Sequence, residues 1–257
     1  NKENPRTNRE DVEYLINGLT HVFPEIQLKV EDVISSWAGL RPLIHEEGKS
    51  ASEISRKDEI FISDSNLVSI AGGKLTGYRK MAERVVDEVA DRLKRKYEIK
   101  SKRCKTHKII ISGGGYSNAE EVASYIDKIA DRLSTHGFDR YEAEYMVHNY
   151  GKQSDRLVDY FIEQEDHTEL GLISSELWFG LNFEMVNSAM DFFSRRTGRL
   201  YFNIQSIREY KKELLAQMGE HLSWSDERMK QEEAWVDQAI NEASHFPPQA
   251  QTENLAS

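Results

Sequence analysis

A short apolar run that ends in two glycines is the feature that most constrains the fold of this chain. Residues 67–71 have the composition of a strand, and Gly72 and Gly73 follow directly. Beyond the glycines, apolar side chains recur at four-residue steps, at Met81, Val85, Val89 and Leu93. This spacing places them on one face of a helix. The pattern therefore predicts a strand, a glycine turn and a helix in direct succession.

Lys74 follows the two glycines and is the first candidate site residue. The N-terminus of a helix carries partial positive charge, so a lysine there is locally unfavourable. Glycines allow a backbone to approach a ligand closely, and the free N–H groups at a helix start bind anions. The sequence thus indicates an anion-binding turn at Lys74, with a flexible turn and a solvated lysine as the alternative.

The rest of the first hundred residues mixes helix and strand patterns. We predict a helix at 10–19 with Asn8 as its cap, strands at 28–30, 33–44 and 59–63, and a loop at 45–55. In an extended strand, Arg41 shares a face with Ser35, Trp37 and Gly39, which suggests a pocket wall. The planar guanidinium of arginine can bind two phosphate oxygens at once. An arginine on an edge strand, paired with a carboxylate, is the alternative for Arg41, and Arg56 is the weaker candidate.

The chain becomes mainly helical beyond a basic, polar stretch at 99–107, which we interpret as a linker. Helices are predicted around 122–133, 141–150, 154–164, 184–196, 204–218 and 226–243. Residues 175–183 fit either a strand or the front of a helix. The cluster of aromatic residues between Trp178 and Phe193 is interpreted as core, and Arg195 and Arg196 should end a helix.

The three glycines at 113–115 superficially resemble a dinucleotide-binding loop. However, Asn118 replaces the third glycine of the G-x-G-x-x-G pattern, and the following region is helical rather than a strand–helix–strand unit. We therefore predict a turn and a helix cap, made by Ser117 or Asn118.

Composition excludes several classes of function. The formal net charge of -10 argues against nucleic-acid binding, which needs a basic surface. Cys104 is the single cysteine, so no internal disulfide can form, and the cytoplasm is the expected compartment. No apolar run approaches the roughly 20 residues of a membrane span, although peripheral membrane contact stays compatible with the sequence. His107, His136, His148 and His167 lack metal-ligand spacing, so no metal site is expected.

Three motifs in one order resemble the flavin-dependent glycerol-3-phosphate dehydrogenase and oxidase family. They are 36–43 (SWAGLRPL), 54–56 (ISR) and 72–79 (GGKLTGYR). The later stretch 192–198 (FFSRRTG) is similar to the C-terminal helical domain of that family. The resemblance covers nearly the whole chain. It departs from the family at Gly77, where a hydroxyl residue is more usual, and we expect little consequence.

The resemblance implies a role for each candidate residue. Arg41 and Arg56 would bind the phosphate or polar end of glycerol 3-phosphate, and Lys74 would be a catalytic residue beside the flavin ring and the substrate. FAD would contact Gly72, Gly73, Lys74, Leu75 and Thr76. Hydride transfer places negative charge on the flavin's pyrimidine edge, which a lysine and a helix N-terminus can stabilise.

The resemblance also implies an α+β fold in which the closing strands and helix of an FAD- and substrate-binding domain precede a mainly α-helical domain. We expect the first domain at 1–98, the linker at 99–107, the helical domain at 108–246 and a disordered tail at 247–257. The N-terminal FAD-binding segment and the presumed catalytic histidine of the family have no counterpart in this sequence. The chain alone should therefore be inactive.

The expected activity is oxidation of glycerol 3-phosphate to dihydroxyacetone phosphate, with electrons passing through FAD to a quinone. An oxygen-using oxidase is a close variant, and an autonomous helical interaction domain at 116–243 is the alternative from another class. Unpaired strand edges should favour a homodimer or poor solubility. The expected location is the cytoplasm, or the periphery of the membrane at its inner face.

Overall fold

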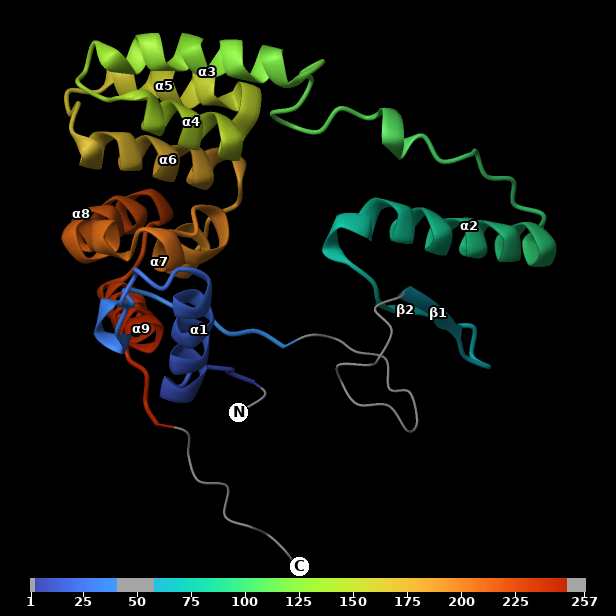
Figure 1. The fold of residues 1–257 in the computed structure, drawn as a ribbon. Helices are drawn as coiled ribbons and strands as arrows, with labels where there is room; N and C mark the ends of the chain where they lie inside the picture. The colour runs from blue at the N-terminus through green and yellow to red at the C-terminus, as the bar shows by residue number, and fades with distance from the viewer. Residues whose placement is uncertain (1–2, 41–57, 249–257) are drawn as a thin grey trace, which may run out of the picture. The chain divides into compact units, whose positions relative to one another are not determined.

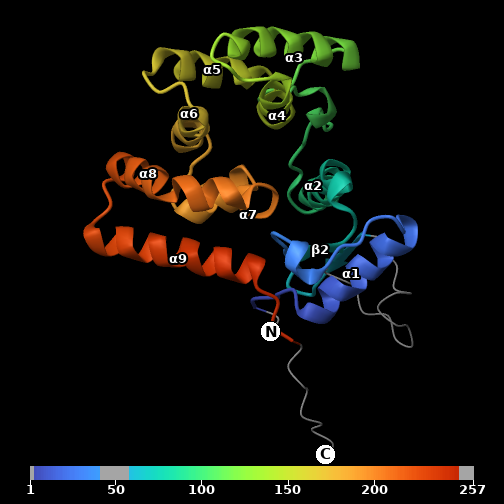
Figure 2. The same ribbon diagram turned by 60° about the vertical axis from the view of Figure 1, so that its left-hand side comes forward.

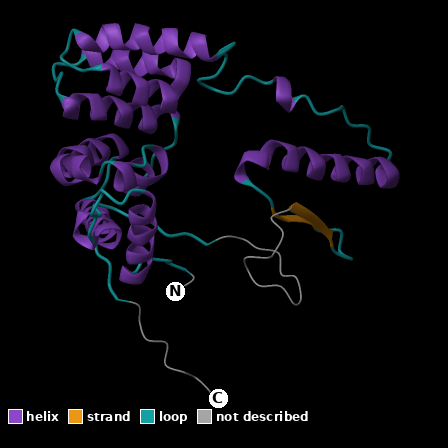
Figure 3. Ribbon diagram, viewed as in Figure 1, coloured by secondary structure: helices purple, strands orange, loops and turns teal. Residues whose placement is uncertain are grey.

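The computed structural model describes residues 3–40 and 58–248, and within them it is mainly helical with one two-stranded sheet (Figures 1 and 3). The chain divides into two compact units. The larger unit combines Asn1–Gly39 with Ser112–Ser257, and the smaller unit is Leu40–Ile111. A mainly helical chain with one small sheet agrees with the predicted α+β class at this coarse level.

The division into units differs from the expected one at the start of the chain. The segment up to Gly39 clusters with the helices of the larger unit rather than with the glycine turn. The expected linker, 99–107, falls in the smaller unit and contains part of the 3-10 turn η3 (Thr106–Lys108). The expected end of the first domain at 98, the start of the helical domain at 108 and the start of the tail at 247 stay predictions.

The larger unit contains eight α-helices and three shorter helical elements among its described residues. The α-helices are α1 (Arg9–Val22), α3 (Ala119–Ser134), α4 (Arg140–Tyr150), α5 (Ser154–Glu163), α6 (Glu169–Phe183), α7 (Arg199–Phe202), α8 (Ile204–Leu222) and α9 (Asp226–Ser244). The shorter elements are the 3-10 turns η1 (Val30–Asp32) and η4 (Gly151–Gln153) and the π-helix η5 (Asp191–Arg196).

Short polar side chains determine where several of these helices begin. The Asn8 side chain accepts a hydrogen bond from the N–H of Asp11 at 2.8 Å, and this confirms the predicted cap of α1. Asn118 does the same for α3 by accepting from Glu121 N–H at 2.8 Å. The glycines at 113–115 therefore lead into a capped helix, as the sequence indicated.

Two hydrophobic clusters form the core of the larger unit, and α6 contributes to both. Leu172 and Phe179 pack with residues of α3, α4 and α5, whereas Ile173 and Leu177 pack with residues of η5, α8 and α9. Figure 2 shows α6 between the α3–α5 layer and the α7–α9 layer. Because both faces of α6 are buried, its sequence has no amphipathic period. This explains why 175–183 fitted either a strand or a helix; it is the second half of α6.

The predicted strands at 28–30 and 33–44 are wrong over their described residues. Residues 30–32 form η1, and residues 33–40 pair with no described strand. The hydrogen bonds of this segment go to helices instead. Ser36 N–H donates to the Ala243 carbonyl at 2.8 Å, and the Ser35 hydroxyl donates to the Leu200 carbonyl at 2.8 Å. The segment thus hydrogen-bonds to α7 and to the end of α9 rather than to another strand.

The helix predicted at 184–196 is also shorter than expected. Helix α6 ends at Phe183, Met185 has a positive φ of 55°, and the π-helix η5 begins at Asp191. The Asp191 carboxylate accepts hydrogen bonds from the N–H groups of Asn187 and Ser188 at 3.1 and 3.0 Å. These bonds stabilise a turn before η5. The predicted end at Arg196 is confirmed, because Gly198 follows with a φ of 64°.

The smaller unit contains the hairpin β1 (Asp58–Ile62) and β2 (Val68–Gly72), followed by the 3-10 turn η2 (Leu75–Gly77) and helix α2 (Tyr78–Tyr97). The strands pair antiparallel, with Asp58 opposite Gly72. No side chain in the described part of this unit, 58–111, is fully buried. A lone hairpin beside one helix has little core, so we expect this unit to need further packing for stability.

A close backbone contact joins two glycines of the larger unit. Lys152 N–H donates to the Gly113 carbonyl at 2.9 Å, and both Gly113 and Gly151 have positive φ angles, of 78° and 56°. A Cβ atom on Gly151 would lie 2.0 Å from the Gly113 carbonyl oxygen. The glycine at 113 therefore serves packing against the end of α4 rather than a nucleotide.

Replacing Gly151 by alanine should destabilise the larger unit by about 2 kcal/mol or more, since a positive φ and a backbone overlap both cost free energy. Gly137→Ala is the matched control. Gly137 also has a positive φ, of 88°, but a Cβ atom added to it would have nothing within 4 Å. It should cost only about 1 kcal/mol. Urea unfolding followed by circular dichroism measures both losses, and equal losses would contradict the contact.

Candidate functional site

The glycine turn between β2 and α2 has the geometry of a backbone site. Gly72 ends β2 with a φ of 75°, and Gly73 follows with a φ of 81°. Both angles lie in the left-handed region, which glycine adopts without a steric penalty. The turn therefore requires these residues at these positions.

Packing inside the smaller unit adds a second reason for Gly73. A Cβ atom there would lie 2.7 Å from the Met81 sulfur of α2 and 3.1 Å from Cβ of Asp58 in β1. Asp58 also forms an ion pair with Arg84 of α2. The hairpin and the helix are thus joined directly behind the turn.

Lys74 lies in the exposed segment that follows. It has an extended backbone, with φ −104° and ψ 142°, and its carbonyl accepts from Gly77 N–H at 2.8 Å. The sequence had suggested that Lys74 lies at the start of the helix. The α-helix begins only at Tyr78, however, so the 3-10 turn η2 separates Lys74 from it. Leu75 is 89% exposed. The first N–H groups of such a turn have no partner within the turn itself. The Lys74 ammonium group and the first main-chain N–H groups of the turn therefore lie together at one accessible place.

Arg41 and Arg56, the predicted substrate-binding residues, lie outside the described residues. The structure describes Gly72, Gly73, Lys74, Leu75 and Thr76 as consecutive parts of one turn. The contacts of these five residues with a cofactor stay predictions. The binding of substrate by Arg41 and Arg56 also stays a prediction.

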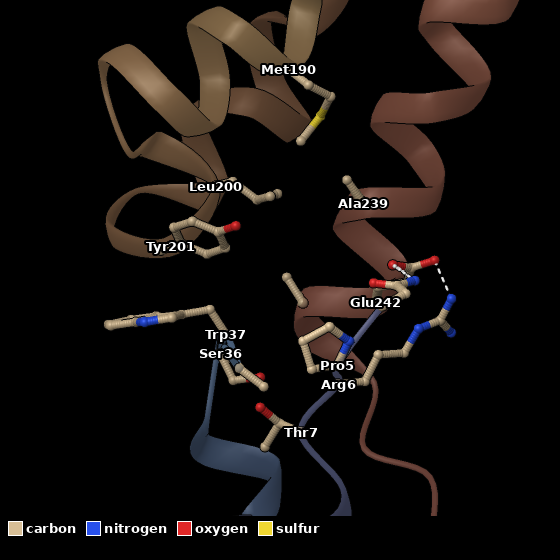
Figure 4. Close-up of a pocket in the computed structure, with 13 residues that line it drawn as sticks. Pro5, Arg6, Thr7, Ser36, Trp37, Met190, Leu200, Tyr201, Ala239 and Glu242 are labelled. Carbon is tan, nitrogen blue, oxygen red and sulfur yellow. Dashed lines mark hydrogen bonds and ion pairs between the residues drawn. The ribbon is translucent and has the colours of Figure 1, made fainter. Parts of the chain in front are cut away.

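Trp37, which the sequence placed on the same face as Arg41, lies in the larger unit. Its ring contacts Tyr201 and Phe202 at centroid distances of 5.4 and 5.3 Å. It lines a cavity of about 220 Å³ between the N-terminal segment, α7 and α9 (Figure 4). Arg6 also lines this cavity and is paired with Glu242 at 2.5 Å. Because this cation already has a partner, the cavity is best explained as packing of the N-terminal segment.

Sequence reasoning missed a second group of polar residues, in the larger unit. The Glu176 carboxylate, in α6, accepts a hydrogen bond from the Tyr150 hydroxyl at 2.8 Å and forms an ion pair with Arg199 of α7. Burial, followed by the charge of Glu176, raises the pKa of the Tyr150 hydroxyl well above its ordinary value. The available signal was Glu176 itself, a single acidic residue within the apolar run of α6.

Two further features concern metals and membranes. The described residues include no group of three or more histidine, cysteine, aspartate or glutamate side chains arranged to hold a metal ion. Within the same parts of the chain, the helices lack the combination of length and apolar character that crossing a membrane requires.

Comparison with known proteins finds the same family that the three sequence motifs resemble. Residues 104–229 match the family model of the C-terminal domain of alpha-glycerophosphate oxidase. The aerobic glycerol-3-phosphate dehydrogenase of Bacillus subtilis is 43% identical over 229 residues, which are 88% of this chain and 41% of that protein. The Staphylococcus epidermidis enzyme of the same name is 41% identical over 94% of this chain and 44% of its own length.

A solved structure shows the same relationship in three dimensions. The glycerol-3-phosphate dehydrogenase of Bacillus halodurans, determined by X-ray methods in complex with FAD, is 38% identical with a TM-score of 0.78. The match covers 97% of this chain and 47% of that one. This chain belongs to the glycerol-3-phosphate dehydrogenase and oxidase family.

Family membership extends to the glycine turn as well as to the helices. The domain model matches α3 to α8, and the B. halodurans dehydrogenase aligns over nearly the whole chain. The chain spans less than half the length of the curated glycerol-3-phosphate dehydrogenases that it matches. It corresponds to the C-terminal part of such proteins.

The packing behind the turn can be tested with two alanine substitutions. Gly73→Ala should loosen the hairpin, because the new methyl group meets Met81 and the φ of 81° is unfavourable for alanine. Gly77→Ala is the control, since its Cβ would lie an ordinary 3.7 Å from the Met81 sulfur and its φ is −88°. Amide hydrogen exchange of β1 and β2 should accelerate only in Gly73→Ala. Similar exchange in the two variants would contradict this packing.

Proposed function

We propose that this chain forms the C-terminal part of an FAD-dependent glycerol-3-phosphate dehydrogenase. The complete enzyme oxidises sn-glycerol 3-phosphate to dihydroxyacetone phosphate and passes the electrons through FAD to a quinone. Two kinds of observation support the proposal. Relatives in B. subtilis and S. epidermidis carry the name aerobic glycerol-3-phosphate dehydrogenase, and the similar B. halodurans structure is a complex with FAD.

The observation that carries the proposal is the turn at Gly72, Gly73 and Lys74. Its two positive φ angles turn the chain sharply from β2 toward α2, and the following residues, Lys74 to Thr76, are exposed. This donor set fits the anionic pyrimidine edge of a reduced flavin, since it offers main-chain N–H groups and an ammonium group. FAD bound here would supply the acceptor for the hydride of the substrate carbon. Lys74 and the N–H groups of the turn would hold its pyrimidine edge and would stabilise negative charge there.

Arg41 and Arg56 complete the proposed site by holding the phosphate of the substrate. A guanidinium group can bind two phosphate oxygens in one plane, which fixes the orientation of the ligand as well as its charge. Orientation matters because the reacting carbon must lie close to the flavin for hydride transfer.

Substitutions in a polypeptide of the relatives' full length test these roles. Arg41→Ala and Arg56→Ala should each lower kcat/KM by roughly 30-fold, which corresponds to about 2 kcal/mol for one lost charged hydrogen bond. Lys74→Met should lower kcat at saturating substrate, because it removes a charge that acts in the transition state. Steady-state formation of dihydroxyacetone phosphate measures all three.

Lys80→Met serves as the control for Lys74. Lys80 is exposed in α2 and pairs with Glu83 at 2.7 Å, so its loss should leave the kinetics unchanged. Unchanged kinetics for Lys74→Met, Arg41→Ala and Arg56→Ala would contradict the assignment of the site. Stoichiometric hydrogen peroxide without any quinone requirement would instead identify an oxidase.

The proposed location is the cytoplasm, with peripheral contact at the inner face of the membrane. A basic stretch supports this location. Residues 94–108 include Lys94, Arg95, Lys96, Lys100, Lys102, Arg103, Lys105 and Lys108, against one acidic residue, Glu98. Ile109, Ile110 and Ile111 follow and are 65%, 73% and 71% exposed. Cations beside exposed apolar side chains are attracted to anionic lipid surfaces.

Vesicle sedimentation of the chain tests this contact. Binding to phosphatidylglycerol vesicles should exceed binding to phosphatidylcholine vesicles. Lys102→Gln with Lys105→Gln should weaken binding about 30-fold, since each cation near the surface contributes roughly 1 kcal/mol. Lys212→Gln with Lys230→Gln is the control, because these lysines are exposed on α8 and α9. Equal weakening by both pairs, or binding that ignores lipid charge, would contradict the proposed contact.

A further inference from the structure

Two arginines of α2 reach the hairpin of the smaller unit, one near each end of β1 (Figure 1). Arg84 forms an ion pair with Asp58, the first residue of β1. Arg92 donates a hydrogen bond to the side-chain oxygen of Asn66, in the loop between β1 and β2, at 3.4 Å. Eight residues of helix rise about 12 Å, which is similar to the length of a short strand. Helix α2 therefore runs along β1 and is tied to the hairpin at both ends.

The contact at Asp58 differs from the contact at Asn66 because it lies against the glycine turn. Asp58 is the strand partner of Gly72 in the antiparallel ladder. A Cβ atom on Gly73 would lie 3.1 Å from Cβ of Asp58. Arg84 thus holds the residue against which the turn packs.

The side chains behind the turn differ in how firmly they fix its position. The three atoms nearest to a Cβ atom on Gly73 belong to Met81 and Asp58. A methionine side chain is flexible, so it fills space without setting a distance. A charged hydrogen bond has a preferred short length, so the Arg84–Asp58 pair restricts the separation of α2 and β1. No side chain in the described part of this unit, 58–111, is fully buried, so packing alone provides little further restraint.

The position of the turn matters because the proposed site acts through hydrogen-bond donors. Lys74 and the first N–H groups of the turn come directly after Gly73. Hydrogen bonds weaken steeply as their geometry departs from the ideal, and electrostatic stabilisation in enzymes depends on donors that are already in place. A shift of β2 relative to α2 would therefore move these donors away from their acceptor.

We propose that Arg84 is a positioning residue: through its ion pair with Asp58, it holds the glycine turn where Lys74 and the turn N–H groups meet the flavin edge. This inference rests on the proposed function of the turn. Arg84 itself contacts neither substrate nor cofactor in this arrangement. Arg92 is the matched control, because it ties the far end of the same hairpin to the same helix.

Kinetics and redox titration of a polypeptide of the relatives' full length separate positioning from stability. The side chains of Arg84 and Asp58 are 47% and 22% exposed, so loss of their pair in Arg84→Met should lower kcat only about threefold. KM should change little. The midpoint potential of the bound flavin should fall by about 15 mV, which is a threefold loss at roughly 30 mV per tenfold for two electrons. Arg92→Met should leave kcat and the potential unchanged.

Two further variants test whether Arg84 acts through Asp58. Arg84→Lys keeps a cation that can reach Asp58, so it should recover most of kcat. Asp58→Asn should reproduce the loss seen in Arg84→Met. The two changes together should lose no more than either alone, because residues that act through one contact are not additive.

Amide hydrogen exchange of the same polypeptide, without substrate, gives a readout that needs no catalysis. Exchange in residues 70–77 should accelerate about threefold in Arg84→Met and stay unchanged in Arg92→Met. Residues 63–67, at the other end of the hairpin, should show the reverse.

Equal kcat and equal midpoint potential in Arg84→Met and Arg92→Met would overturn the inference, as would full additivity of Arg84→Met and Asp58→Asn. A wild-type polypeptide that binds no flavin would instead contradict the proposed function, together with the flavin part of this inference. The exchange comparison would then still show whether Arg84 holds the turn.

Discussion

The carboxylate of Glu176 is the group on which the arrangement of the larger unit depends. It belongs to α6, between the two hydrophobic clusters, and it joins Tyr150 of α4 to Arg199 of α7. A buried charge is strongly destabilising when its partner is removed, so these helices must meet in one orientation. The same α7 also receives the N-terminal segment, because the Leu200 carbonyl accepts from the Ser35 hydroxyl at 2.8 Å. The ionic contact thus connects the helical core to the helix on which the N-terminal segment packs.

The parts of the fold that could be predicted from sequence are those determined by local chemistry. Asn8 and Asn118 cap helices as expected, and the two glycines at 72 and 73 turn the chain between β2 and α2. The failures have tertiary causes. Residues 33–40 resemble a strand in sequence but hydrogen-bond to α7 and α9. The sequence of α6 shows no amphipathic period because both faces of this helix are buried. In each case the deciding partner is distant in sequence, so a local pattern could not reveal it.

The glycine turn and the polar group around Glu176 differ in the same way. The motif around Lys74 is contiguous, so its residues could be recognised together, and comparison with the B. subtilis and B. halodurans proteins confirms the family. Only the start of the α-helix, at Tyr78 rather than beside Lys74, had to be corrected. The polar group around Glu176 combines residues from α4, α6 and α7, and no spacing in the sequence connects Tyr150 with Arg199. Its hydrogen bond and ion pair become visible only in the folded chain.

The measurement that most directly tests the central claim is the visible absorbance of a polypeptide of the relatives' full length that contains this chain, recorded without oxygen before and after addition of glycerol 3-phosphate. The account predicts a bound oxidised flavin whose absorbance bleaches when the substrate is added, which would establish cofactor, substrate and hydride transfer together. A colourless protein, or a flavin spectrum that glycerol 3-phosphate leaves unchanged, would contradict it.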